Sequence, residues 1–348
     1  MNRRFLASLG GPVAVIGLLG SAGVPLRAQA PGEGSQSSSG GAKTSASPAV
    51  RHQARTPRTP WGDPDLQGVW DYKTITPLER PQNLAGREFL TTDEADQLEA
   101  RAARRLDEPP DDSVPANTIH APYWTDPGRK VLDDKRTSLI VDPADGRIPP
   151  LTPEGQARAA SRRGTRAGGA DGAEDRSSLE RCITWGFPTA ILPGLYNNNI
   201  RIVQGPGYVA ITHEMVHETR LIPLDGRAEL SPKIRQWFGE SRGHWDGDTL
   251  VVESQNFSDK TSYRGSGATL HTIERFTRVG KDAIDFRLTV DDPHTFVRPW
   301  TVALPMRTSE GDLYEYACSE ANVGLYDILE VARDEEKAAA EAAKRQKP

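Results

Sequence analysis

Five consecutive residues, from His213 to His217, have the side chains best suited to chemistry, in the order His-Glu-Met-Val-His. In zinc hydrolases this spacing lies on a helix, where residues four positions apart share one face. Two imidazoles then hold the metal, and the glutamate activates a bound water. Along a strand the two histidines would be roughly 13 Å apart, too far to share one ion. The chemistry therefore depends on the backbone conformation of residues 208–222.

The composition of residues 208–222 predicts a strand, because β-branched residues are frequent and turns at Gly205 and Asp225 bracket the segment. His213 and His217 would then share a face with apolar neighbours. Such histidines are either hydrogen-bonded core residues or groups that contact a ligand inside the domain. A helical conformation, with zinc held by His213 and His217, is the alternative.

Glu214 and Arg220 would lie on the opposite face of this strand. A solvent-exposed face of paired charges explains them, whereas a barrel with a polar interior would reverse the assignment. Glu214 and His217 are the candidate catalytic residues, and His213 and Arg220 are candidate ligand contacts. No cofactor is expected unless the zinc hypothesis holds.

Further candidate ligand contacts are polar or aromatic residues near predicted strand ends, where binding residues often collect. For each of them a turn or ordinary core packing is the alternative explanation. These candidates are Tyr196, Asn198, His244, Trp245, Arg298 and Trp300. The sequence contains no glycine-rich phosphate loop, nucleophile elbow or Cys-x-x-Cys pair.

Cys182 and Cys318 are the only cysteines of the chain. In an oxidising compartment two thiols can form one disulfide, so we predict a bond between them. Two buried, unpaired thiols are the alternative. A cysteine nucleophile is not expected, because no histidine accompanies either cysteine in the sequence.

The first thirty residues have the pattern of a secretory signal peptide, with Arg3 and Arg4, an apolar stretch and an Ala-x-Ala box at Ala28 to Ala30. Residues 31–60, rich in Gly, Ser and Pro, are predicted to be a disordered linker. We therefore expect a periplasmic or secreted protein without a membrane span after cleavage of residues 1–30.

The overall composition excludes two classes of protein. With 36% hydrophobic residues and a mean hydropathy of −0.58, the chain can form a sizeable core but not a set of membrane spans. Its formal net charge is −5, so no basic surplus favours nucleic acid as a partner. A small-molecule ligand is expected instead, and the oligomeric state is left open.

Residues 177–331 are predicted to be a mainly β, antiparallel domain, because short runs of apolar residues are separated by tight turns from Ile200 onward. The clearest strand is 283–291, where apolar and polar residues alternate. Residues 249–253 are apolar without alternation, which indicates a strand covered on both faces. We expect a barrel-like meander, with a β-sandwich as the alternative.

Before this domain, residues 61–176 are predicted to be a small strand-and-helix segment that wraps or caps it. Thr91 and Glu94 have the spacing of a capping box, and Pro153 suits the first turn of a second helix. After it, residues 332–348 consist mostly of Ala, Glu, Lys and Arg, which indicates a helical or disordered tail.

Several phrases of the chain resemble a widespread group of secreted bacterial proteins, usually called hypothetical. The phrases are Arg242 to Glu253 (RGHWDGDTLVVE), Leu224 to Arg227 (LDGR), Pro64 to Trp70 and Asp291 to Trp300. The likeness covers most of residues 61–325. It implies export and a β-rich domain, and no activity or site residue follows from it.

Three functions fit these observations. The first is an exported barrel that binds, and could transform, a small apolar or aromatic molecule in a pocket near Trp300, Arg298, His217 and Trp245. The second is a zinc-dependent hydrolase using residues 213–217. The third is an envelope interaction protein that has no pocket. Whether the protein is an enzyme is left open at this point.

Overall fold

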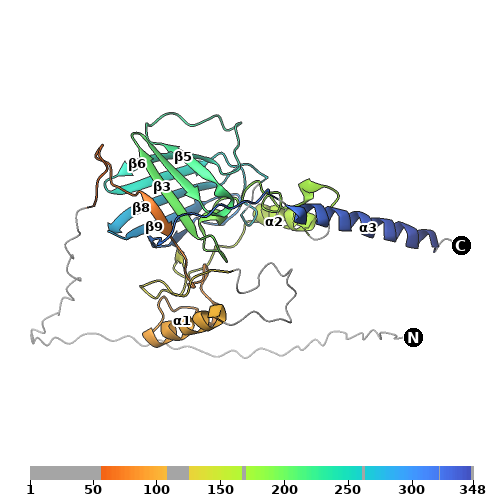
Figure 1. The fold of residues 1–348 in the computed structure, drawn as a ribbon, viewed down its shortest axis with the longest axis horizontal. Coiled ribbons are helices and arrows are strands. Elements are labelled where there is room, and N and C mark those ends of the chain that lie inside the picture. The colour runs from red at the N-terminus through yellow and green to blue at the C-terminus, as the bar shows by residue number, and fades with distance from the viewer. Residues whose placement is uncertain (1–55, 108–124, 167–169, 261–262, 321, 346–348) are drawn as a thin grey trace, which may run out of the picture. The chain divides into compact units, whose positions relative to one another are not determined.

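The computed structural model describes residues 56–107, 125–166, 170–260, 263–320 and 322–345 (Figure 1). The predicted signal peptide, and the predicted linker as far as residue 55, lie outside the described residues. The side chains of residues 162–166 are also not described.

Eleven strands of the described residues form one antiparallel sheet. Its main path runs in the order β5-β4-β3-β1-β11-β9-β8-β7-β6, and β10 pairs with both β9 and β2. The strands are β1 (Gly68–Asp71), β2 (Ile140–Asp142), β3 (Asn199–Gly205), β4 (Tyr208–His213), β5 (Thr219–Pro223), β6 (Glu240–Asp246), β7 (Thr249–Gln255), β8 (His271–Gly280), β9 (Ala283–Asp291), β10 (Trp300–Ala303) and β11 (Met306–Thr308).

The two ends of this path, β5 and β6, lie beside each other, so the sheet is nearly closed into a barrel. Gly243 of β6 makes the close approach possible. A Cβ atom at this position would lie 2.7 Å from Leu224 and 2.9 Å from Ile222, where any larger side chain would clash. The barrel predicted from the sequence is confirmed, and the sandwich alternative is not needed.

Alternating side chains of the strands face the barrel interior. The prediction for residues 283–291 is confirmed, because Ile284, Phe286, Leu288 and Val290 of β9 are all fully buried. Residues 250–252 of β7 are buried on both faces, as their unbroken apolar run predicted.

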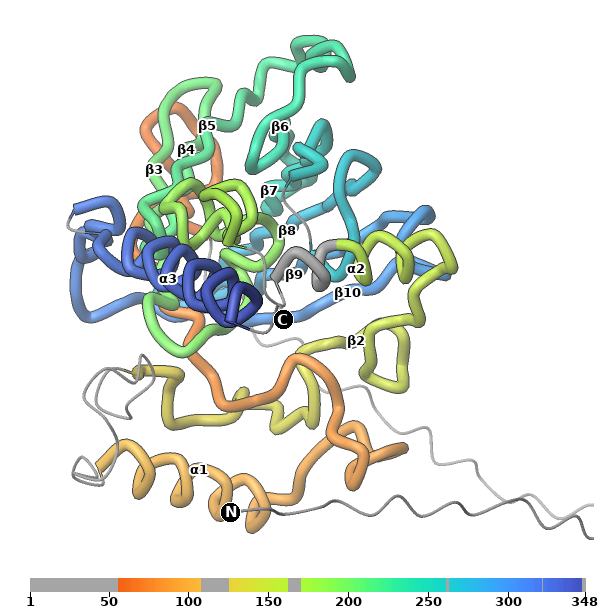
Figure 2. Tube along the Cα trace, turned by 90° about the vertical axis from the view of Figure 1, so that its right-hand side faces the viewer, coloured from red at the N-terminus to blue at the C-terminus, as the bar shows by residue number. Residues whose placement is uncertain are grey.

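The N-terminal segment contributes to the barrel itself, because β1 lies between β3 and β11. β2 pairs with β10, which in turn pairs with β9. Figure 2 shows β2 next to β10. Helix α1 (Thr92–Asp107) begins with the predicted capping box, in which Thr91 and Glu94 bond to each other's backbone N–H. Helix α2 (Pro153–Arg166) begins at the predicted proline.

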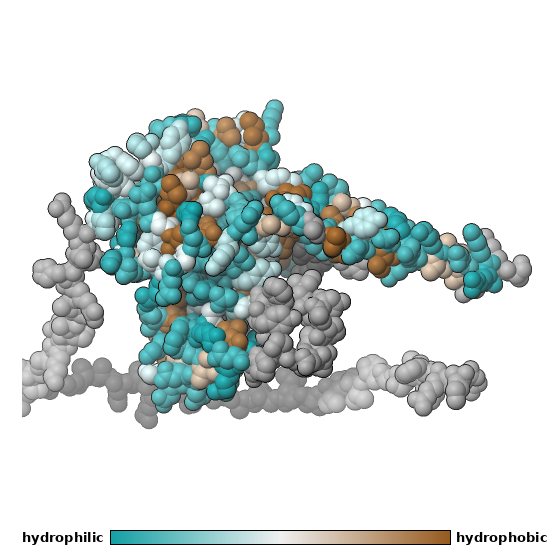
Figure 3. Space-filling view, viewed as in Figure 1, coloured by the Kyte–Doolittle hydropathy of each residue, from teal (hydrophilic) through white to brown (hydrophobic). Residues whose placement is uncertain are grey.

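The C-terminal helix α3 (Val323–Arg345) has no buried residue. In Figure 3 hydrophobic residues are interspersed among hydrophilic ones along it. Just before it, Cys318 is bonded to Cys182, with 5.5 Å between their Cα atoms, which confirms the predicted pairing. No helix among the described residues is both long and apolar enough to cross a membrane.

Candidate functional site

The His-Glu-Met-Val-His segment is the turn between β4 and β5, so the single strand expected for residues 208–222 is wrong at positions 214–218. His213 ends β4, and its N–H donates to the carbonyl of Glu218 over 2.9 Å. Val216 and His217 follow with φ angles of 63° and 53°, in the left-handed region. A β-branched residue rarely adopts that conformation, which stores strain in the turn.

This turn sends the two histidines to different surroundings. His213 is fully buried, and its Nδ1 bonds to the carbonyl of Ala190 at 3.2 Å. His217 is exposed, and its ring bonds to the backbone of Tyr314 and Tyr316. No group of three or more His, Cys, Asp or Glu in the described part of the chain could hold a metal ion. The zinc hypothesis therefore has no geometric support there.

The two glutamates of the turn fasten it to neighbouring segments. Glu214 accepts hydrogen bonds from the side chain of Asn199 (2.7 Å) and from the N–H of Tyr314 (3.3 Å). Glu218 accepts a hydrogen bond from the hydroxyl of Thr184 at 2.5 Å. Burial raises the pKa of Glu218 to about 7. Glu214 and His217, the candidate catalytic residues, thus have structural partners in the hairpin turn.

Arg220 points into the barrel, so the assignment of its strand face to solvent is wrong. Its side chain is only 4% exposed and its partner, Glu274 of β8, is 0% exposed. Two parallel hydrogen bonds of 2.5 and 2.8 Å join the guanidinium to the carboxylate. A pair buried in this way must be matched in charge, because either group alone would be very costly to bury.

His213 and Arg220 lie against the same two phenyl rings. The guanidinium carbon of Arg220 is 4.6 Å from the ring centre of Phe187 and 5.8 Å from that of Phe238. The imidazole of His213 is 6.4 and 5.3 Å from the same ring centres. We refer to these four residues and Glu274 as the histidine cluster.

The electrostatics of the cluster keep His213 neutral. Burial, followed by the positive charge of Arg220, lowers the pKa of His213 to about 3. The carbonyl of Ala190 can only accept, so Nδ1 carries the proton and Nε2 has a free lone pair. His213 is therefore a hydrogen-bond acceptor at its buried Nε2.

Several buried polar atoms of the interior have no hydrogen-bond partner among the described residues. In the cluster these are Nε2 of His213 and Nε of Arg220; elsewhere in the barrel they are Oγ1 of Thr272 and Nε1 of Trp245 and Trp300. Buried polar atoms are nearly always paired, with protein, with ordered water or with a bound ligand. Atoms of the same kind also occur outside the interior, on Arg176, Asn199, Arg242 and Arg333. The two in the histidine cluster lie against the same pair of phenyl rings and mark the candidate binding region.

The strand register places Trp245 and Trp300 around Glu274. Residues that pair across neighbouring strands form rows that run around the barrel. Glu274 of β8 pairs with Val252 of β7. Trp245 lies in the adjacent interior row on one side, where it pairs with Leu250, and Trp300 lies in the adjacent interior row on the other side, where it pairs with Val290. The structure thus brings four predicted contacts to one interior: His213, Arg220, Trp245 and Trp300.

The remaining predicted contacts lie elsewhere. Arg298 is exposed and paired with Asp142 at 2.7 Å. His244 is exposed on β6. Asn198 is buried, but its amide closes a loop by bonding to both backbone groups of Gly194. Tyr196 bonds to the side chain of Tyr316, whose pKa burial raises to about 12.

Sequence reasoning missed Phe187, Phe238 and Glu274. Phe187 and Phe238 lie outside the strands, where periodicity carries no information on burial. Glu274 shares its parity on β8 with Thr272 and Phe276, and all three are buried. Phe276 lies on the same face of β8 as Glu274, and this signal could have predicted that Glu274 points into the barrel.

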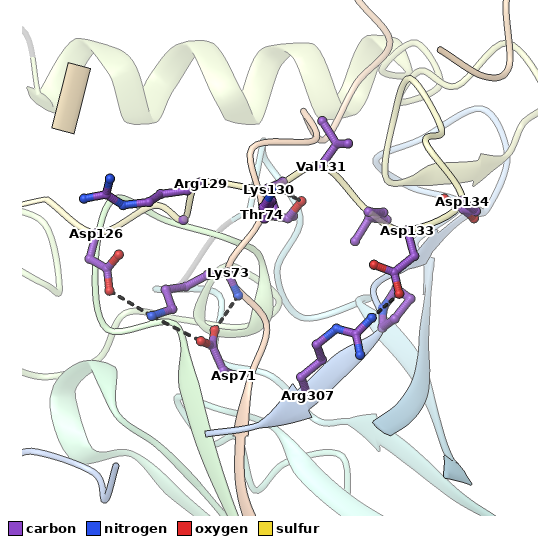
Figure 4. A pocket seen from close by; sticks show the side chains of 13 residues that line it. Asp71, Lys73, Thr74, Asp126, Arg129, Lys130, Val131, Asp133, Asp134 and Arg307 are labelled. Carbon is purple, nitrogen blue, oxygen red and sulfur yellow. Dashed lines mark hydrogen bonds and ion pairs between the residues drawn. The ribbon is translucent and has the colours of Figure 1, made fainter. Parts of the chain in front are cut away.

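A cleft of about 530 Å³ opens where the chain leaving β1 meets residues 126–134 and Arg307 (Figure 4). Its charges are paired. Lys73 lies between Asp71 (3.1 Å) and Asp126 (2.9 Å), and Arg307 is paired with Asp133. The cleft has the volume of a ligand site, but its lining gives no strong preference for an anion or a cation.

Tyr72 connects this cleft to the histidine cluster. It stands in the chain between Asp71 and Lys73, which line the cleft, and is itself buried. Its hydroxyl donates to the carbonyl of Ala190 at 3.0 Å, the same carbonyl that accepts Nδ1–H of His213. Burial raises the pKa of Tyr72, so this hydroxyl remains a donor.

Comparison of the chain with protein-family models, with curated proteins and with solved structures found no match. The functional argument therefore rests on the geometry of the cluster and the cleft.

Proposed function

We propose that this protein acts after export and binds a small apolar or aromatic molecule at the end of its barrel that contains the histidine cluster. One observation carries the proposal. Two buried polar atoms without partners, on His213 and Arg220, flank the same two phenyl rings. Apolar walls with a few convergent polar groups are the usual composition of a small-molecule site.

The surroundings of the cluster support this location. Phe187 and Ala190 belong to residues 184–198, which cover the cluster without forming a strand. The cleft beside Tyr72 has the volume of a ligand and provides the entrance in this proposal. In this proposal a ligand passes from the cleft to the cluster when residues 184–198 and the side chain of Tyr72 move aside. The disulfide is consistent with an oxidising compartment outside the cytoplasm.

Fluorescence titration with N-phenyl-1-naphthylamine, a neutral apolar probe, tests the proposal. We expect a saturable increase with one probe per chain. Phe187→Ala, which removes the ring over Arg220, is expected to weaken binding about tenfold or more. The matched control is Phe296→Ala, which removes another fully buried ring, packed on Trp300. Absence of saturable binding, or equal loss in both variants with the fold retained, would refute the proposal.

A further inference from the structure

The chemical class of the ligand can be inferred from the polar atoms of the cluster, and this inference rests on the proposed function. Nε2 of His213 is an acceptor without a donor, because Nδ1 holds the ring proton and gives it to Ala190. The site therefore requires a ligand atom that carries a hydrogen and can donate it.

Arg220 sets the second requirement. Its two terminal nitrogens are both occupied by Glu274, and Nε is buried without a partner. This Nε–H can only donate. The site therefore also requires a lone pair on the ligand, within reach of a donor that lies against the same rings as His213.

The ion pair sets the charge of the ligand. Glu274 neutralises Arg220 through two hydrogen bonds, so the cluster has no free positive charge for a carboxylate or phosphate. An anion would meet the carboxylate of Glu274 in a medium of low dielectric, where like charges repel strongly. An ammonium group has no lone pair to accept the Nε–H of Arg220, so it would leave that donor unpaired. The ligand is neutral at this point.

One small group satisfies all three requirements, since a hydroxyl donates one hydrogen and accepts through its lone pairs. A carbonyl would leave Nε2 of His213 unpaired, and a hydrocarbon would leave both atoms unpaired. The faces and edges of Phe187 and Phe238 favour a flat aromatic body beside the hydroxyl.

We propose that the ligand is an uncharged phenol, whose hydroxyl donates to Nε2 of His213 and accepts from Nε–H of Arg220, and whose ring lies against Phe187 and Phe238.

The test compares p-cresol with p-xylene, which has a methyl group in place of the hydroxyl, and with p-toluate, the corresponding anion. Displacement of N-phenyl-1-naphthylamine measures all three. We expect p-cresol to bind at least about tenfold more tightly than p-xylene, because a hydrocarbon leaves buried polar groups unpaired. p-Toluate should bind no more tightly than p-xylene.

Two pairs of variants assign the effect. His213→Phe removes the acceptor, and Arg220→Met combined with Glu274→Met removes the donor without leaving a buried carboxylate unpaired. Each should lower the preference for p-cresol over p-xylene about threefold or more. Their controls are His271→Phe, a half-exposed histidine beside Glu253, and Arg242→Met, whose Nε is also without a partner but whose carboxylate partner is Glu240. Both controls should keep the preference of the unmodified protein.

The outcomes separate the two proposals. If the probe and p-xylene bind but p-cresol binds no more tightly, the phenol inference is wrong while the proposed function stands; water alone then satisfies the two atoms. If neither the probe nor any of the three compounds binds, the proposed function is wrong. The comparison of compounds on the unmodified protein decides this even where a variant does not fold.

Discussion

Removal of one partner of the buried Arg220–Glu274 pair should strongly destabilise the protein. Arg220→Met keeps apolar volume against Phe187 but leaves the carboxylate of Glu274, which has no exposed surface, without a counter-charge. Breaking a buried ion pair in this way costs about 3–5 kcal/mol. Glu274→Met should cost a similar amount, because it leaves the guanidinium uncompensated.

The double variant Arg220→Met with Glu274→Met should be much more stable than the sum of the single variants predicts. Removing both charges avoids the cost of burying either one, and such double replacements are often neutral or stabilising. The expected coupling is therefore several kcal/mol. Arg275→Met is the control, since Arg275 is the next residue on β8, is 42% exposed and is paired with Asp246. It should cost less than about 1 kcal/mol.

The assay is equilibrium unfolding in urea, followed by tryptophan fluorescence and circular dichroism, for the four variants and the unmodified chain. A cost below about 1 kcal/mol for Arg220→Met would show that the pair is not desolvated. The reasoning would also be refuted if the destabilisation of the double variant equalled the sum of those of the two single variants. Two residues that form one pair should not contribute to stability independently.

Four further predictions concern the turn, two titrating groups and the disulfide. Val216→Gly should stabilise the chain by about 1 kcal/mol in urea unfolding, because Val216 has a φ of 63° that glycine adopts without strain; destabilisation would mean that the valine's packing outweighs the strain. The pKa of His213 is about 3 when folded and 6.5 in the unfolded chain, so the unfolded chain binds more protons in between and stability is lost as pH falls from 6.5 towards 3. The slope is up to about 1.4 kcal/mol per pH unit, and His213→Phe should remove it. Glu218 has the opposite effect on stability, because its pKa is about 7 when folded and 4.5 in the unfolded chain. Its contribution to folding stability is lost as pH rises from 4.5 to 7. Glu218→Gln should remove that slope, and an unchanged pH profile in either variant contradicts the assignment. Cys182→Ser with Cys318→Ser opens a loop of 136 residues and should cost up to about 5 kcal/mol in urea unfolding; equal stability of the unmodified protein with and without reductant would argue against the bond's contribution.

Local signals in the sequence predicted the elements that depend on neighbouring residues. Alternation along residues 283–291 places four side chains of β9 in the interior because successive side chains point to opposite faces. The spacing of Thr91 and Glu94 predicted the start of α1, since a capping box is formed within one turn. The two cysteines required only their small number and an oxidising compartment.

The candidate site was predicted in part. His213 and Arg220 were singled out by residue type and by a motif match, but for the wrong strand geometry. A turn with positive φ is normally marked by Gly, Asn or Asp, whereas here Val216 and His217 occupy it. Without that mark, residues 208–222 were expected to form one strand, and the different fates of the two histidines were not foreseen.

The sequence by itself thus determined a mainly β architecture, the paired cysteines and the residues able to do chemistry. Only the tertiary structure decided which of these residues meet. Arg220 and Glu274 are 54 positions apart and pair across the interior because β5 closes against β6. Barrel closure depends on all strands at once, and the partners it brings together leave no trace in the local pattern around either residue.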